Sequence, residues 1–109
     1  SVRFYDWGDS VIAHPFASML VGLGAVIYTD RCPPGDPRIL RLRDAYLEAF
    51  TDLAPHRELV TTLELACRVA KVARALVWHR AVRAFPDADP NWTTAPLESL
   101  ESVLDDSYL

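Results

Sequence analysis

Cysteine is scarce in this chain: Cys32 and Cys67 are the only two among 109 residues, so they form the only disulfide pair available. A chain with so few cysteines and no signal segment is typical of a reduced, cytoplasmic protein, with a single disulfide as the alternative. Long apolar runs are missing too, since none reaches the roughly 18 residues expected of a membrane-spanning helix. We also find no internal repeat and no low-complexity tract. We therefore expect a cytoplasmic protein without a membrane partner.

Positive charge is missing from the last quarter of the chain. No Lys or Arg follows Arg83, whereas six acidic residues do: Asp87, Asp89, Glu98, Glu101, Asp105 and Asp106. The whole chain has 11 Lys and Arg against 15 Asp and Glu, a net charge of −4. Nucleic acid is therefore not an expected partner, because its recognition needs clustered cations. A weakly acidic surface either suits a cationic substrate or serves only solubility.

The residues that are present belong to a folded protein. Half of them are apolar and 24% are charged, which is ordinary for a globular domain and too apolar for intrinsic disorder. A chain of 109 residues supports one compact core. We expect a single domain over residues 1–109.

Apolar residues recur at helical spacing in four stretches separated by helix breakers. The spacing predicts helices over residues 15–28, 37–53, 56–83 and 95–105. Three prolines and a glycine between 31 and 37 predict a loop. A short apolar run, Val2, Phe4 and Tyr5, predicts one strand ahead of the helices. The fold class is therefore mainly α, with four helices preceded by one short β-strand.

Two details of packing follow from the same patterns. The longest helix is apolar on most sides from Leu63 to Val77, so we expect the other helices to bury it. Arg68, Lys71 and Arg74 should then extend from it toward solvent or a missing partner domain. In the first helix, Gly22 and Gly24 predict close packing against a neighbouring backbone.

The most informative segment is Asp6-Trp7-Gly8-Asp9, directly after the predicted strand. A carboxylate at the end of a buried strand needs a cation or several hydrogen-bond donors to offset its lost hydration. Asp6 is therefore either a metal ligand or a turn-capping residue. Asp9 either orients Asp6, binds a second ion or is a surface turn carboxylate.

This segment, together with His14-Pro15-Phe16, resembles the metal-binding segment of aminoglycoside phosphotransferases and their choline-kinase-like small-molecule kinase relatives. The resemblance implies that Asp6 binds Mg²⁺ ions that bridge the phosphates of ATP, or of GTP. It also implies transfer of the γ-phosphate to a hydroxyl of an aminoglycoside, a sugar or an amino alcohol. Many family members have an aspartate soon after the proline, where this chain has Ala17-Ser18-Met19. Whatever structure that aspartate braces in the family is therefore braced differently here or not at all.

The resemblance also implies that the nucleotide-binding lobe and a His-Gly-Asp catalytic loop lie upstream of these residues. We therefore expect this chain to be the C-terminal helical portion of a kinase-like phosphotransferase and to be inactive alone, because its catalytic base lies outside it. Removal of its neighbour should leave apolar surface uncovered, so dye binding or self-association is expected.

Other candidate residues carry weaker signals. His14 precedes a proline and a helix, where a capping role is expected. Family substrate pockets are built from this helical region, which makes Trp78 and His79 candidate substrate contacts, along with Tyr46, Glu48 and Glu64. The two cysteines have no catalytic setting and should be passive.

Two other functions fit the sequence. One is a small helical interaction module without catalytic activity, which should unfold cooperatively as a monomer and expose little apolar surface. The other is a metal-dependent hydrolase that uses Asp6, Asp9 and His14, although these three residues form no recognised zinc arrangement.

Overall fold

The computed structural model describes residues 1–3, 12–85, 87, 89 and 92–109. The described part is mainly α. Its elements are η1 (Pro15–Ser18), α1 (Met19–Asp30), α2 (Pro37–Leu47), η2 (Glu48–Phe50), α3 (His56–Ala84), α4 (Ala95–Glu101) and η4 (Ser102–Leu104), where η denotes a 3₁₀ helix. No described residue lies in a strand; of the strand predicted from Val2, Phe4 and Tyr5, only Val2 is described, and it has no regular structure.

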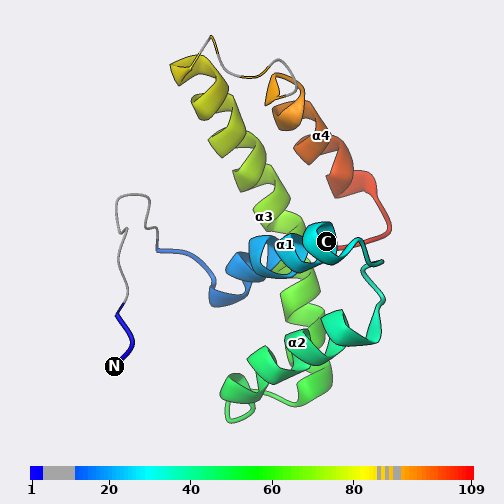
Figure 1. The fold of residues 1–109 in the computed structure, drawn as a ribbon. Coiled ribbons are helices and arrows are strands. Elements are labelled where there is room, and N and C mark those ends of the chain that lie inside the picture. The colour runs from blue at the N-terminus through cyan, green and yellow to red at the C-terminus, as the bar shows by residue number, and fades with distance from the viewer. Residues whose placement is uncertain (4–11, 86, 88, 90–91) are drawn as a thin grey trace.

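α3 organises the fold, as Figure 1 shows. With 29 residues it is by far the longest element. α2 lies beside its N-terminal half, α4 runs along its C-terminal half, and α1 crosses near its middle. Each of the other helices therefore packs on α3, as expected of a central helix. None of the described helices is both long and apolar enough to cross a membrane.

A side chain caps the start of α2, whereas α3 and α4 begin without a side-chain cap hydrogen bond. Asp36 caps α2 by accepting a hydrogen bond from the Arg38 amide at 2.8 Å, and Pro37 occupies the first turn. The carbonyl of Pro55 accepts hydrogen bonds from the first amides of α3. The four predicted helices are confirmed with shifted ends. The first begins as 3₁₀ and extends to Asp30, and the last is α-helical to Glu101 and 3₁₀ to Leu104. Residues 51–53 lie outside the second, which becomes 3₁₀ at Glu48 and ends at Phe50.

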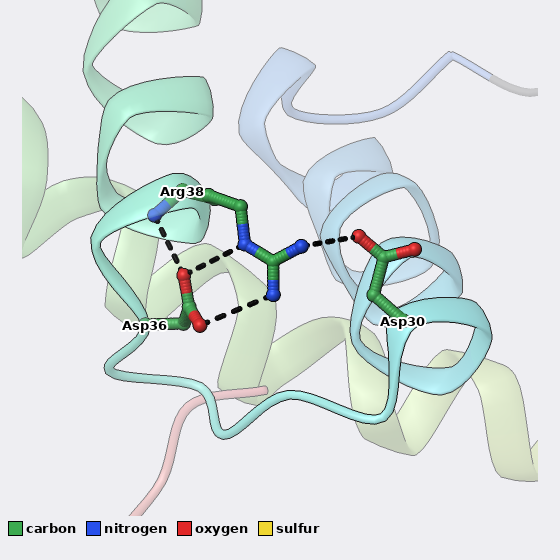
Figure 2. A network of polar contacts seen from close by, with 3 residues as sticks. All are labelled: Asp30, Asp36 and Arg38. Atoms are coloured by element: carbon green, nitrogen blue, oxygen red, sulfur yellow. Dashed lines mark hydrogen bonds and ion pairs between the residues drawn. The ribbon is translucent and has the colours of Figure 1, made fainter.

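The loop between α1 and α2 is braced by one arginine (Figure 2). The Arg38 guanidinium donates to Asp30 at 2.9 Å and to both carboxylate oxygens of Asp36, at 3.1 and 3.2 Å. The hydrogen bonds that Arg38 donates to Asp36 lower the pKa of the Asp36 carboxyl below its usual value. At the other end of the loop Arg31 has a φ of 51°, the left-handed conformation that ends many helices. The loop predicted from its prolines is therefore a defined connection.

The core has two parts. The larger lies between η1, α2 and α3, and its buried members are Phe16, Leu20, Leu47, Leu59, Leu63 and Cys67. The smaller joins α1 to α2 through Leu23, Cys32 and Ile39. Both cysteines are free and buried, so neither forms a disulfide. Tyr108 and Leu109 at the end of the chain pack against the larger core.

Three packing expectations are wrong. α3 is not buried all round, because Leu65, Val69 and Leu76 are 56–64% exposed. Lys71 does not reach solvent: it is 3% exposed. A Cβ placed on Gly22 or Gly24 would meet no described atom within 4 Å, so the glycines do not mark close packing within the described chain.

Candidate functional site

The turn formed by residues 14–18 is the most strongly anchored part of the N-terminal region. Phe16 is 3% exposed and contacts the rings of His14, Tyr46 and Phe50 edge to face or nearly so. Tyr46 donates its hydroxyl proton to the Pro15 carbonyl at 2.9 Å. The turn is thereby fixed to α2.

His14 has the capping role predicted for it. Its Nδ1 accepts a hydrogen bond from the Phe16 amide at 3.2 Å, at the start of η1. This nitrogen is therefore already occupied by a backbone donor. The residues just before it, Asp6, Trp7, Gly8 and Asp9, lie outside the described residues.

Cys67 fixes the same turn to α3. Its thiol lies 3.7 Å from the Phe16 carbonyl and donates a weak hydrogen bond to it. The side chain is fully buried, and burial raises the pKa of the Cys67 thiol to about 11. A thiol that stays protonated at neutral pH is a poor nucleophile, which agrees with the passive role expected for it.

A second site lies between α1, α3 and α4, where a cleft of about 750 Å³ opens to solvent. We name it the aromatic cleft. Its α1 wall includes Gly24 and Tyr28, and its α3 wall includes Lys71, Arg74 and Trp78. The third wall is formed by Ala95 and Glu98 of α4 and by Trp92, which lies three residues before α4. An open concave site that combines aromatic rings with a few charged groups is the usual form of a small-molecule site.

Aromatic and cationic groups meet inside this cleft. The Arg74 guanidinium carbon lies 5.6 Å from the centre of the Trp78 ring, within the range of a cation–π contact. The ring centres of Trp78 and Trp92 are 6.0 Å apart and tilted by 57°. Arg74 is exposed and makes no hydrogen bond or ion pair within the described part of the chain. Its charge is therefore available to a ligand.

Lys71 closes the inner end of the aromatic cleft. Its ammonium group donates to the carbonyls of Ser102 at 2.7 Å and Ser107 at 2.9 Å. Burial lowers the pKa of Lys71 below its usual value. One turn earlier, Arg68 donates to the carbonyls of Asp105 and Asp106 at 2.9 and 2.7 Å. The two cations hold the C-terminal segment against α3.

The other predicted contact residues are not brought together. Of the five candidates only Trp78 lines the aromatic cleft, and His79 on the next position of α3 is exposed outside it. Tyr46 lies on α2 and holds the anchored turn, Glu48 is exposed at the end of α2, and Glu64 is half-buried on α3. Their predicted role as substrate contacts stays a prediction.

Opposite the core, α3 presents an uncovered apolar surface. Leu65, Val69, Val72 and Leu76 are 44–64% exposed and share one side of the helix, and we name them the outer apolar face. An apolar groove of about 650 Å³ runs between the start of this face and the 14–18 turn, lined by His14, Pro15, Leu65 and Val69 among others. The face is therefore continuous with the turn that follows the Asp6 segment.

In residues 1–3, 12–85, 87, 89 and 92–109, no three His, Cys, Asp or Glu side chains are placed to hold a metal ion. No protein-family model, curated protein or solved structure matches this chain.

Sequence reasoning missed most of the aromatic cleft. Tyr28 comes from α1, Arg74 from α3 and Trp92 from the residues just before α4. Periodicity locates these helices along the chain but does not orient them against one another. One signal was available: Trp78 and Arg74 are four residues apart on the same helix, the spacing at which side chains meet.

Proposed function

We propose that this chain is the acceptor-binding helical portion of a Mg²⁺-dependent phosphotransferase, which moves phosphate from ATP to a hydroxyl of a small molecule. The observation that carries the proposal is the anchored turn at residues 14–18, which follows Asp6-Trp7-Gly8-Asp9 after four residues. Phosphoryl transfer depends on positioning and charge neutralisation, so its metal-binding carboxylate needs a fixed support. Phe16, buried beneath the turn and tied to α2 and α3, provides one.

The donor chemistry of the segment fits Mg²⁺. The ion prefers hard oxygen ligands and is usually held by one or two carboxylates plus phosphate oxygens and water. Asp6 would hold it, with Asp9 in support, and the ion would neutralise charge on the phosphates. Within the described residues no other cluster competes for this role.

The outer apolar face also supports this proposal over a self-sufficient helical interaction module. Such a module is expected to expose little apolar surface, whereas this face leaves four apolar side chains uncovered in one row. A lobe that packs against further helices of the same enzyme would cover them. The nucleotide lobe and the catalytic base belong, in this proposal, to that upstream portion.

The test is phosphate transfer by a version extended upstream through the nucleotide lobe. We expect Asp6→Asn to lower kcat by about 100-fold or more, the scale of losing one group that stabilises transition-state charge. The matched control is Asp52→Asn, since Asp52 is exposed after α2 and distant in sequence from the motif. The acceptor panel holds aminoglycosides, sugars and amino alcohols.

A second measurement compares the short and extended proteins. The short chain should transfer no phosphate and should bind a hydrophobic dye through the outer apolar face, and the extended protein should bind much less. Failure of a well-folded extended protein to bind nucleotide would remove the proposal. Phosphate transfer unaffected by Asp6→Asn would remove the metal role of that residue.

A further inference from the structure

We propose that the aromatic cleft binds the phosphate acceptor, and that this acceptor is a hydroxyl-bearing molecule with a planar ring and an anionic or neutral polar group. The inference rests on the proposed function only in taking the ligand of the cleft to be the acceptor. It narrows the acceptor class, because it excludes polycations such as aminoglycosides.

The ring requirement comes from the cleft walls. Trp78 on α3 and Trp92, three residues before α4, present neighbouring rings, and Tyr28 lies on the α1 side, 86% exposed. Trp92 is 50% exposed although it contacts another indole. Exposed aromatic faces that converge on one cleft gain most from a flat ligand that stacks on them.

The charge requirement comes from the cations in the cleft. Lys71 and Arg74 line it, and Glu98 is the one carboxylate among its lining side chains in the described residues. Glu98 also accepts a hydrogen bond from the Thr94 hydroxyl at 2.6 Å. Arg74 is the accessible cation, and a planar guanidinium pairs well with a carboxylate or phosphate. A cationic ligand would meet repulsion at the same place.

The space is open where a ligand would enter. Gly24 lines the cleft, and a Cβ at this position would meet no described atom within 4 Å. Gly22, two residues earlier, is equally open but does not line the cleft. A leucine at position 24 should therefore fill the cleft, whereas a leucine at position 22 should leave it empty.

The experiment uses two probes with one ring system and opposite charge, 2-naphthoate and 2-naphthylmethylammonium. Binding to the 109-residue chain and to the extended protein is followed by calorimetry and by the indole N–H signals of Trp78 and Trp92. We expect the carboxylate probe to bind about tenfold tighter or better. Arg74→Gln should bring the two affinities close together.

Two further variants locate the probe. Trp78→Leu should weaken both probes by about tenfold, the scale of a lost stacking contact, without changing their ratio. Gly24→Leu should abolish binding, and Gly22→Leu should leave it unchanged. Equal or tighter binding of the ammonium probe, or binding that survives Gly24→Leu, would overturn the inference.

The inference and the proposed function fail separately. Charge-selective probe binding without any phosphate transfer would keep the cleft and remove the phosphotransferase. Asp6-dependent transfer to an aminoglycoside, with no effect of Gly24→Leu on its KM, would keep the phosphotransferase and remove the cleft as its acceptor site.

Discussion

The two sides of α3 are similarly apolar in sequence and opposite in burial. On one side the apolar residues are 0–5% exposed and follow one another at intervals of four or eight positions: Leu59, Leu63, Cys67 and Ala75. On the other side the outer apolar face is 44–64% exposed. Apolar composition alone therefore does not determine burial: a side chain is buried only where another element of the chain covers it.

Two different parts of the molecule are built on α3, the anchored 14–18 turn and the aromatic cleft. The buried side holds the 14–18 turn in place through Phe16 and Cys67. The C-terminal half of α3 instead forms the aromatic cleft with α1 and α4, where side chains stay exposed. The proposed phosphotransferase would need both a rigid support and an accessible cleft.

The largest difference between the two sides should appear on truncation of a leucine. Leu63→Ala should lower the free energy of unfolding by about 2–5 kcal/mol, because it removes a fully buried side chain and leaves a cavity. Leu65→Ala, two residues on and 62% exposed, should change it by less than about 0.5 kcal/mol. Urea denaturation of both variants measures the contrast. Equal effects would mean that the outer face is covered in solution.

Alkaline pH should lower the free energy of unfolding through Cys67, which lies on the buried side of α3. Its pKa is raised from 9.0 to about 11 in the folded protein, so above pH 9 the unfolded chain loses the thiol proton while the folded chain keeps it. The stabilisation is thus complete below pH 9 and should fall by roughly 2–3 kcal/mol as the pH rises through 11. Denaturation at a series of pH values measures this loss.

Two cysteine variants isolate the contribution of that thiol. Cys67→Ala should remove its share of the pH dependence, while Cys32→Ala, which keeps Cys67, should retain it. A profile that is the same in both variants would assign the alkaline loss to other groups, such as Tyr108, whose pKa burial also raises.

The helices and the caps at His14 and Asp36 could be predicted from the sequence because their signals are local. Asp36-Pro37 and the 3.6-residue periodicity act within one or two turns. The side of α3 that stays exposed could not be predicted in this way, because both sides carry apolar residues and only the packing of α1, α2 and α4 distinguishes them. The burial of Lys71 could not be predicted for the same reason, because its ammonium group is satisfied by carbonyls 31 and 36 residues away.

A smaller difference is expected between two cations of α3. Lys71→Met should cost about 1–3 kcal/mol of unfolding free energy, because it removes the Lys71 donor from the Ser107 carbonyl and leaves the Ser102 carbonyl with only the Asp105 amide, at 3.3 Å. Arg74→Met, on an exposed residue without a polar partner in the described chain, should cost less than about 0.5 kcal/mol. Amide hydrogen exchange over residues 102–109 should accelerate only in the Lys71 variant. Unchanged exchange there would show that other contacts hold the C-terminal segment.

The smallest expected effect is that of Gly22→Ala, which tests whether the surface of α1 around Gly22 stays uncovered in a larger protein. Gly22 lies inside α1, where alanine is favoured over glycine by about 1 kcal/mol, and its Cβ would meet nothing in the described chain. Gly22→Ala should therefore stabilise the short chain by about 0.5–1 kcal/mol, seen as a rise of a few degrees in Tm. In the upstream-extended protein the outcome depends on what covers α1. The same gain there would mean that this side of α1 faces solvent, whereas a loss would mean that another element approaches Gly22 closely, which is the packing that its sequence predicted.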